Sequence, residues 1–84
     1  MSAEPLTLEQ ACEMLSMAFN EPLAGIEPGR TRESILGWDS MGALMLIAEL
    51  DDRFGVELTA DDSRKMASIA DVLQYLRSRQ LLRE

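Results

Sequence analysis

The chain has 84 residues, 46% of them hydrophobic and only 5% aromatic, so it fits one small domain with a core of aliphatic side chains and methionine. Its 8 basic and 15 acidic residues give a net charge of −7, which disfavours nucleic acid and anionic membranes and favours partners with basic patches. The chain has no histidine and one cysteine, Cys12, so we expect neither an internal disulfide nor an intrinsic metal site.

The first residues carry no basic flank followed by an apolar stretch, so they do not have the pattern of a signal peptide. No hydrophobic stretch is long enough to span a membrane. We therefore expect a cytoplasmic protein, monomeric, with one domain over residues 1–84. Its ends are expected to fray over residues 1–6 and 82–84.

A first amphipathic helix is predicted over residues 8–20. Thr7 and Gln10 have the spacing of a capping box, in which each side chain bonds the other residue's backbone N–H. The apolar stripe of this helix comprises Leu8, Ala11, Cys12, Leu15, Ala18 and Phe19. Cys12 is interpreted as a core residue rather than a reactive thiol, because no basic neighbour at helical spacing would stabilise its thiolate.

A long connection follows, from residue 20 to about residue 39, because prolines and glycines interrupt the helical period. Connections of this length in small domains usually serve a function or pack through their own side chains. We expect Ile26, Ile35 and Leu36 to anchor it to the core, and a short helical turn over residues 31–36.

A second helix is predicted over residues 40–54, and Gly55 has the character of a residue that ends a helix. Its apolar residues are Met41, Ala43, Leu44, Leu46, Ile47, Ala48, Leu50 and Phe54. They cover more than one stripe, so this helix should lie between others. The remaining positions, Gly42, Met45, Glu49 and Asp52, are predicted to follow one exposed line. Met45 on that line is either a partner contact or a scattered surface residue.

Two shorter helical patterns complete the chain. Thr59 is placed to cap a brief third helix, and Ser68 with Asp71 resembles a second capping box. The apolar residues of the last helix are Ile69, Val72, Leu73, Leu76 and Leu81. These elements predict an all-α fold: a four-helix bundle with a long loop between the first and second helices and a short third helix.

Ser40 is the most informative residue, because Asp39 can cap a helix that begins with this serine. The serine hydroxyl then lies at the positive end of the helix dipole, which favours a phosphate group. The same pattern is also typical of a serine that serves only the helix start. A catalytic role is improbable, because the chain has no histidine and nothing places its one lysine, Lys65, near Ser40 to act as a base.

Acidic residues are concentrated after the serine, including Asp51, Asp52, Glu57, Asp61 and Asp62. Their spacing does not match an EF-hand, because a loop starting at Asp51 would place Val56 where glycine is required. A solvated acidic surface is the simplest interpretation.

Three stretches together resemble the acyl carrier protein and peptidyl carrier protein family. They are Leu36-Gly37-Trp38-Asp39-Ser40-Met41, Phe54-Gly55-Val56-Glu57-Leu58 and Ser68-Ile69-Ala70-Asp71-Val72, with methionine where the family's central motif has leucine. The resemblance covers nearly the whole chain. It implies a carrier rather than an enzyme.

In this family a separate transferase attaches 4′-phosphopantetheine from coenzyme A with the help of magnesium. By resemblance Ser40 is the attachment site and Asp39 assists the transfer on the magnesium side. The thiol of the arm then carries acyl or aminoacyl groups as thioesters between activating, condensing and transferase enzymes. By the same resemblance partners dock on the helix that starts at the serine, and our candidate contacts are Met41, Leu44, Met45, Glu49, Asp51 and Asp52.

Fatty acid synthesis carriers often have acidic residues soon after the serine, whereas this chain has Gly42 and Met45. The sequence therefore predicts a discrete carrier of a specialised pathway, such as polyketide, non-ribosomal peptide or modified fatty acid synthesis. The alternative is an unmodified helical interaction module that binds a basic partner through the same acidic and methionine-bearing face.

Overall fold

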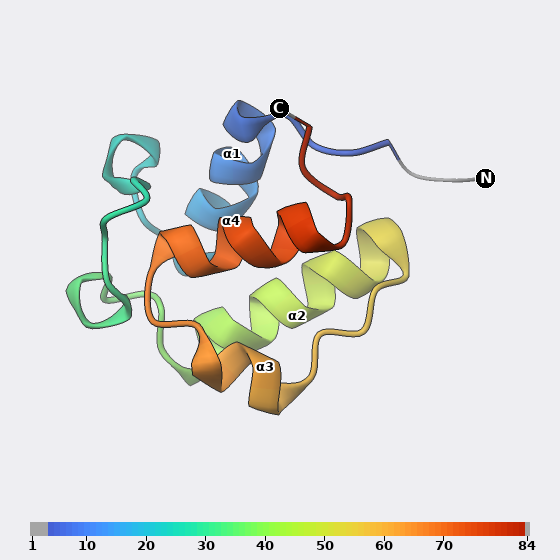
Figure 1. Cartoon of the computed structure of the whole chain (residues 1–84). Helices are drawn as coiled ribbons and strands as arrows, with labels where there is room; N and C mark the ends of the chain where they lie inside the picture. Colours follow the sequence, from blue (N-terminus) through green and yellow to red (C-terminus); the bar gives the residue numbers. More distant parts are fainter. Residues whose placement is uncertain (1–3, 84) are drawn as a thin grey trace.

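The computed structural model describes residues 4–83 as an all-α fold (Figure 1). The helices are α1 (Leu8–Phe19), α2 (Ser40–Phe54), α3 (Ala60–Lys65) and α4 (Ile69–Ser78), with two short 3-10 turns, η1 (Leu23–Gly25) and η2 (Arg32–Ser34), in the α1–α2 connection. This order confirms the predicted four helices, the long loop and the short third helix. In the view of Figure 1, α4 crosses the middle with α1 above it and α2 below it, and α3 lies below α2.

The helix ends form where the capping residues predicted them. Thr7 with Gln10 and Ser68 with Asp71 both make complete capping boxes. Gly55 ends α2 in the left-handed conformation, with φ 66°, which glycine adopts without steric cost. These signals are local, so they act the same way in any tertiary context.

The core lies where the four helices meet. Its fully buried side chains include Met14, Leu15, Phe19, Ile35, Leu46, Leu50, Leu58, Ile69, Val72 and Leu76. Sequence analysis missed Met14, which continues the inward stripe of α1, and wrongly included Leu8, which lies at the first position of α1 and is 52% exposed. Cys12 is half-buried beside the core, as expected for a structural cysteine.

Three further predictions about packing are wrong. Leu36 does not anchor the long connection, because its side chain is 94% exposed, whereas Ile26 and Ile35 are buried as predicted. Gly42 is buried and therefore does not belong to the exposed line of α2. The last helix ends at Ser78, and Leu81 follows it in a chain reversal in which the Leu81 N–H bonds the Leu76 carbonyl.

The two ends of the described chain are paired rather than frayed. The Leu6 N–H donates to the Leu81 carbonyl at 2.8 Å, and Leu6 and Leu82 form a parallel bridge with both side chains buried. The prediction of frayed ends is therefore wrong for Leu6 and Leu82, because burying two leucines offsets the entropy of ordering the ends. Residues 1–3 and 84 of the same prediction lie outside the described residues.

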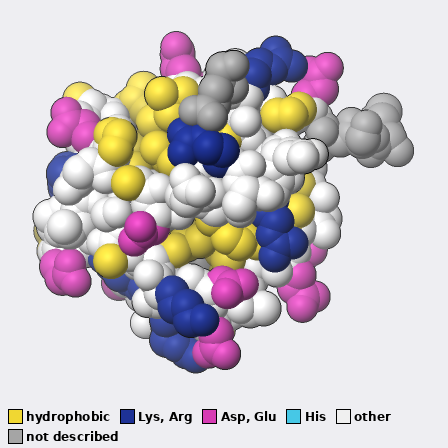
Figure 2. All heavy atoms as spheres, in the orientation of Figure 1, with side chains coloured by type: hydrophobic (Ala, Val, Ile, Leu, Met, Phe, Trp, Pro, Cys, Tyr) yellow, Lys and Arg dark blue, Asp and Glu magenta, His cyan; other side chains and the backbone are white. Residues whose placement is uncertain are grey.

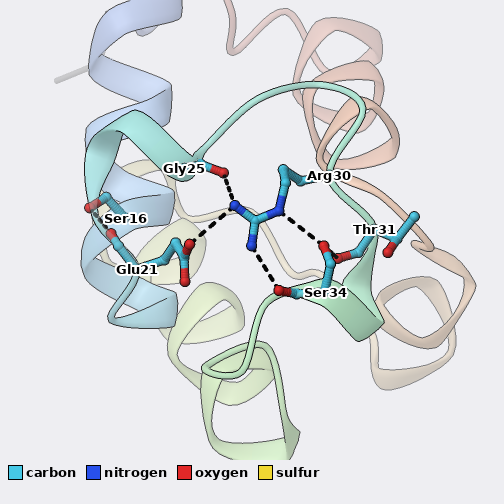
Figure 3. A network of polar contacts seen from close by, with 6 residues as sticks. All are labelled: Ser16, Glu21, Gly25, Arg30, Thr31 and Ser34. Atoms are coloured by element: carbon cyan, nitrogen blue, oxygen red, sulfur yellow. Dashed lines mark hydrogen bonds and ion pairs between the residues drawn. The ribbon is translucent and has the colours of Figure 1, made fainter.

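The long connection is organised around Arg30 (Figure 3). Its guanidinium donates to the Gly25 carbonyl at 2.8 Å and to the Ser34 carbonyl at 2.7 Å, and pairs with Glu21 at 3.2 Å. The connection also reaches the start of α4, where the Ile69 N–H donates to the Arg30 carbonyl at 3.0 Å. One arginine thus holds both 3-10 turns and supports the segment that leads to Ser40.

Candidate functional site

The site is the first turn of α2. Asp39 is the N-cap, and its Oδ1 accepts a hydrogen bond from the Gly42 N–H at 2.9 Å. Ser40 follows at the first helical position, and both residues are exposed. The structure therefore places Ser40 as the sequence predicted, with its side chain accessible at the positive end of a helix of 15 residues.

Two glycines bring the site close to α1. A Cβ at Gly37 would lie 1.5 Å from the carbonyl oxygen of Phe19, and a Cβ at Gly42 would lie 2.0 Å from the carbonyl oxygen of Gly37. No side chain could occupy either position without moving the backbone. The first turn of α2 therefore lies directly against the segment before it, which explains why a glycine occurs inside this helix.

The aromatic residue before the cap fixes the same segment. Trp38 is buried and stacks on Phe19, with ring centroids 4.7 Å apart and an interplanar angle of 13°. The Arg32 guanidinium also lies over the Trp38 ring, 5.5 Å from its centroid. Trp38 is thus held inside the fold, whereas Asp39 and Ser40, which follow it, are exposed.

Arg32 also links this segment to α3. Its Nη1 donates to the carbonyl oxygens of Ser63 at 3.0 Å and Met66 at 3.3 Å, near the C-terminal end of α3. A cation at a helix C-terminus is favourable, because it satisfies free carbonyls and opposes the negative end of the dipole. Sequence analysis did not identify Arg32, since both its partners are backbone atoms more than 30 residues away.

The predicted docking residues lie on the exposed side of α2. Met41, Leu44 and Met45 are 66%, 59% and 45% exposed, and their spacing places them in one stripe. Asp51 and Asp52 are exposed near the other end of the helix, while Glu49 is less exposed and pairs with Arg53 at 2.7 Å. The first turn of α2 contains no acidic residue. Leu36, missed by sequence analysis as a surface residue, adds a nearly fully exposed side chain just before the site.

A groove lies beside the serine, between α2 and α3. We call it the Ser40 groove; its cavity volume is about 200 Å³. Its lining includes Ser40, Leu44 and Ile47 of α2, Ala60 and Ser63 of α3, and Arg32 of the loop. A larger hollow of about 440 Å³ between α3 and α4 is not lined by Ser40 or Asp39, so it is not part of this site.

The site contains no catalytic base for its serine. Among residues 4–83, no side chain forms a hydrogen bond with the Ser40 hydroxyl, and the sequence has no histidine. Within the same described range, no group of three or more cysteine, aspartate or glutamate side chains is placed to hold a metal ion. No helix in that part of the chain has the length and apolar character needed to cross a membrane.

On the face shown in Figure 2, acidic and basic side chains are interspersed among hydrophobic ones, and at the lower edge several charged groups of both signs adjoin. Two of the cations near the site have partners in the chain. Arg64, at the edge of the Ser40 groove, pairs with Asp61, and Arg32 bonds the end of α3. Neither cation is therefore without a partner in the described chain.

An all-helical domain that displays an exposed serine at a capped helix start has the form of a carrier domain. Comparison with known proteins agrees with this class. Residues 9–76 match the family described as "Phosphopantetheine attachment site". A relative in Ralstonia nicotianae, "Acyl carrier protein 3", is 23% identical over 74 residues, which are 88% of this chain and 85% of that protein.

The match covers most of the chain, so the protein belongs to the phosphopantetheine attachment family. It is a carrier and not an enzyme, and the family's domain is the place where 4′-phosphopantetheine is attached covalently. Carriers of this kind interact with a phosphopantetheinyl transferase and with biosynthetic enzymes.

Proposed function

We propose that Ser40 is the residue that accepts 4′-phosphopantetheine. The Ser40 oxygen attacks the coenzyme A phosphorus bonded to pantetheine, the diphosphate P–O bond breaks, and adenosine 3′,5′-bisphosphate leaves. The hydroxyl proton passes to a base of the transferase, because Ser40 contacts none in the described chain. The observation that carries the proposal is the exposed hydroxyl at the capped first turn of α2.

Asp39 is proposed to assist this step on the magnesium side of the transferase site. Its Oδ1 accepts the Gly42 N–H, and the side chain remains exposed beside Ser40. A carboxylate has more lone pairs than this one bond uses, so the other oxygen can face a magnesium ion carried by the partner. The same side chain thereby holds the helix start and presents a metal ligand.

The decisive test compares the wild type with Ser40→Ala after incubation with coenzyme A, magnesium and a broad-range transferase. Mass spectrometry should detect one arm on the wild type and none on Ser40→Ala. Ser78→Ala is a matched control, because Ser78 is an exposed serine of α4 that lies outside the α2 cap. An unmodified wild type, or an arm on Ser40→Ala, would contradict the assignment.

Docking is proposed to depend on the apolar stripe of α2, Met41, Leu44 and Met45, with Glu49, Asp51 and Asp52 providing charge farther along the helix. Removing apolar surface from water stabilises a complex whatever the ionic strength, whereas contacts between exposed charges are screened by salt. Partner binding through the first turn should therefore depend weakly on salt. A weak salt dependence would distinguish this protein from a carrier whose first turn of α2 is acidic.

On this basis we propose a discrete acyl or aminoacyl carrier of a specialised pathway rather than of general fatty acid synthesis. The support is the absence of acidic residues from the first turn of α2, combined with three exposed apolar residues in its first two turns, Met41, Leu44 and Met45. Mass spectrometry of the protein isolated from its native cell would identify the cargo. A cytoplasmic location is proposed as well, because the thiol of the arm must stay reduced.

A further inference from the structure

The short third helix, α3, is held only weakly by its own side chains. All six of its residues are described, and Ser63 is the one among them that is buried. The Ser63 hydroxyl makes no hydrogen bond within residues 4–83, and the buried apolar residues Leu58 and Met66 lie outside the helix, before and after it. Hollows of about 200 Å³ and 440 Å³ lie between α3 and α2 and between α3 and α4. A helix this short is marginal by itself, so contacts from other segments must hold it in place.

Arg32 supplies contacts of this kind at the C-terminal end of α3. Its backbone N–H donates to the Ala67 carbonyl at 2.9 Å. Its Nη1 donates to the carbonyls of Ser63 at 3.0 Å and Met66 at 3.3 Å. A charged donor makes stronger hydrogen bonds than a neutral one, and the half-buried position of Arg32 strengthens them further. These bonds hold the last turn of α3 and the residues that follow it.

The same guanidinium contacts the segment that leads to the serine. It lies over the ring of Trp38, 5.5 Å from the centroid, and only Asp39 separates Trp38 from Ser40 in the chain. This contact is favourable, because the face of an indole ring attracts a cation. One side chain therefore touches both α3 and the residue before the α2 cap. The position of α3 relative to Ser40 depends on it.

That position matters because α3 forms part of the surface around the serine. Ala60, Ser63 and Arg64 of α3 line the Ser40 groove together with Ser40 itself. An enzyme that reaches the Ser40 hydroxyl therefore also meets the adjoining side of α3. If α3 samples other positions, only the fraction of molecules that have it in place can bind this enzyme, and the apparent affinity falls in proportion to that fraction.

We propose that Arg32 is a positioning residue for attachment of the arm: it fixes α3 relative to Ser40 and so sets the affinity of the transferase for this chain. The role depends on attachment at Ser40, which is itself proposed. Arg32 acts without touching the reacting atoms. The Oδ1 of Asp39 still caps α2 and Trp38 still stacks on Phe19 when Arg32 is replaced, so the step after binding keeps its rate. The effect of Arg32 therefore falls on KM for the carrier and not on kcat.

The test compares the wild type with Arg32→Gln, Arg32→Lys and Arg83→Gln. Initial rates of arm transfer from coenzyme A by a broad-range transferase, taken over a range of carrier concentrations where every variant is folded, give KM and kcat separately. Backbone amide shifts of residues 60–62, at the end of α3 away from its Arg32 contacts, report the position of the helix. Emission of Trp38, the one tryptophan in the sequence, reports the guanidinium contact. Arg83→Gln is the matched control, because it removes the same charge at an exposed residue outside the Ser40 groove.

Arg32→Gln should raise KM about tenfold, the change expected for losing hydrogen bonds from a charged donor, and should change kcat by less than about twofold. The amides of residues 60–62 and the emission of Trp38 should shift in the same variant. Arg32→Lys keeps the charge and a donor for the α3 carbonyls but lacks the planar group that lies over Trp38, so it should raise KM only about threefold. Arg83→Gln should match the wild type in every measurement.

A folded Arg32→Gln variant with the KM of the wild type, or one in which only kcat falls, would overturn the proposal. Unshifted amides at residues 60–62 would do the same. A wild type that accepts no arm would refute attachment at Ser40 instead, and the amide shifts of the unmodified variants would still decide whether Arg32 positions α3. Thermal midpoints establish that each variant folds. If Arg32→Gln does not, an Arg32→Lys variant identical to the wild type in KM and in the amide shifts would overturn the proposal by itself.

Discussion

Gly42 offers the sharpest test of how the site is built, through the substitution Gly42→Ala. In an ordinary helix interior, replacing glycine with alanine stabilises by about 1 kcal/mol. Here the added Cβ would lie 2.0 Å from the Gly37 carbonyl oxygen and 3.1 Å from an aromatic carbon of Phe19. The nearest atom belongs to the backbone and cannot rotate away, so the first turn of α2 must move.

Overpacking a buried contact costs about 1–3 kcal/mol, and an approach of 2.0 Å to a backbone atom belongs in the upper part of this range, about 2–3 kcal/mol. The gain in helix propensity offsets about 1 kcal/mol of this. We therefore expect Gly42→Ala to lower the free energy of unfolding by about 1–2 kcal/mol. In a domain of this size, that corresponds to a fall of about 4–16 °C in the thermal midpoint. Urea unfolding followed by far-ultraviolet circular dichroism measures the first quantity and a thermal scan the second.

Gly29→Ala is the matched control for this substitution. A Cβ at Gly29 would have no neighbour within 4 Å, and the residue does not have a positive φ. Alanine there should leave the protein unchanged or stabilise it by up to about 1 kcal/mol, since it restricts the unfolded chain. A Gly42→Ala variant as stable as Gly29→Ala would refute the close approach between α2 and Gly37.

Three other substitutions test the rest of the structure. Arg30→Gln should lower the free energy of unfolding by about 2–3 kcal/mol, because it removes charge-assisted hydrogen bonds to the carbonyls of Gly25 and Ser34. Its control is Arg53→Gln, which breaks an exposed ion pair with Glu49 and should cost under about 0.5 kcal/mol. Urea titration measures both values. Burial raises the pKa of the Cys12 thiol above its ordinary value of 9.0. The protonated Cys12 thiol therefore contributes fully to the free energy of unfolding below the pKa of the unfolded thiol, and this contribution is lost as pH rises through the pKa of the folded thiol. Cys12→Ala should flatten the plot of unfolding free energy against pH in this alkaline range. Met45→Glu should reduce kcat/KM of arm transfer about tenfold without changing the thermal midpoint, whereas Met17→Glu, on an exposed residue of α1, should leave both unchanged.

The elements of this fold could be predicted from the sequence because their signals are local. A capping box depends on residues three positions apart, and a glycine after an apolar stretch ends a helix whatever surrounds it. The same applies to the site: Asp39 and Ser40 occupy the N-cap and first helical positions, as their spacing predicted. The attachment of an arm at Ser40 remains a prediction.

The parts that could not be predicted depend on contacts between distant residues. Counting helical positions placed Gly42 on the exposed side, but the segment before α2 folds back over the first turn and covers it. Leu36 has the hydrophobic character of an anchor, yet the neighbouring Ile35 and Trp38 fill that part of the core. Ser63 is buried although it lies among the charged residues of a short helix, so its sequence neighbours gave no indication that its side chain is inside.

The two glycines and Trp38 together explain how a carrier without catalytic groups can still serve an enzyme accurately. In the proposed attachment at Ser40 the base comes from the partner, so the reaction rate depends on where the Ser40 oxygen lies when the two proteins meet. A misplacement of about 1 Å can cost about 100-fold in rate. Stacking of Trp38 on Phe19 and the close contacts at Gly37 and Gly42 fix the backbone on both sides of the serine. Gly42→Ala should therefore slow arm transfer even at temperatures where the variant is fully folded, because the serine is retained and only its position changes.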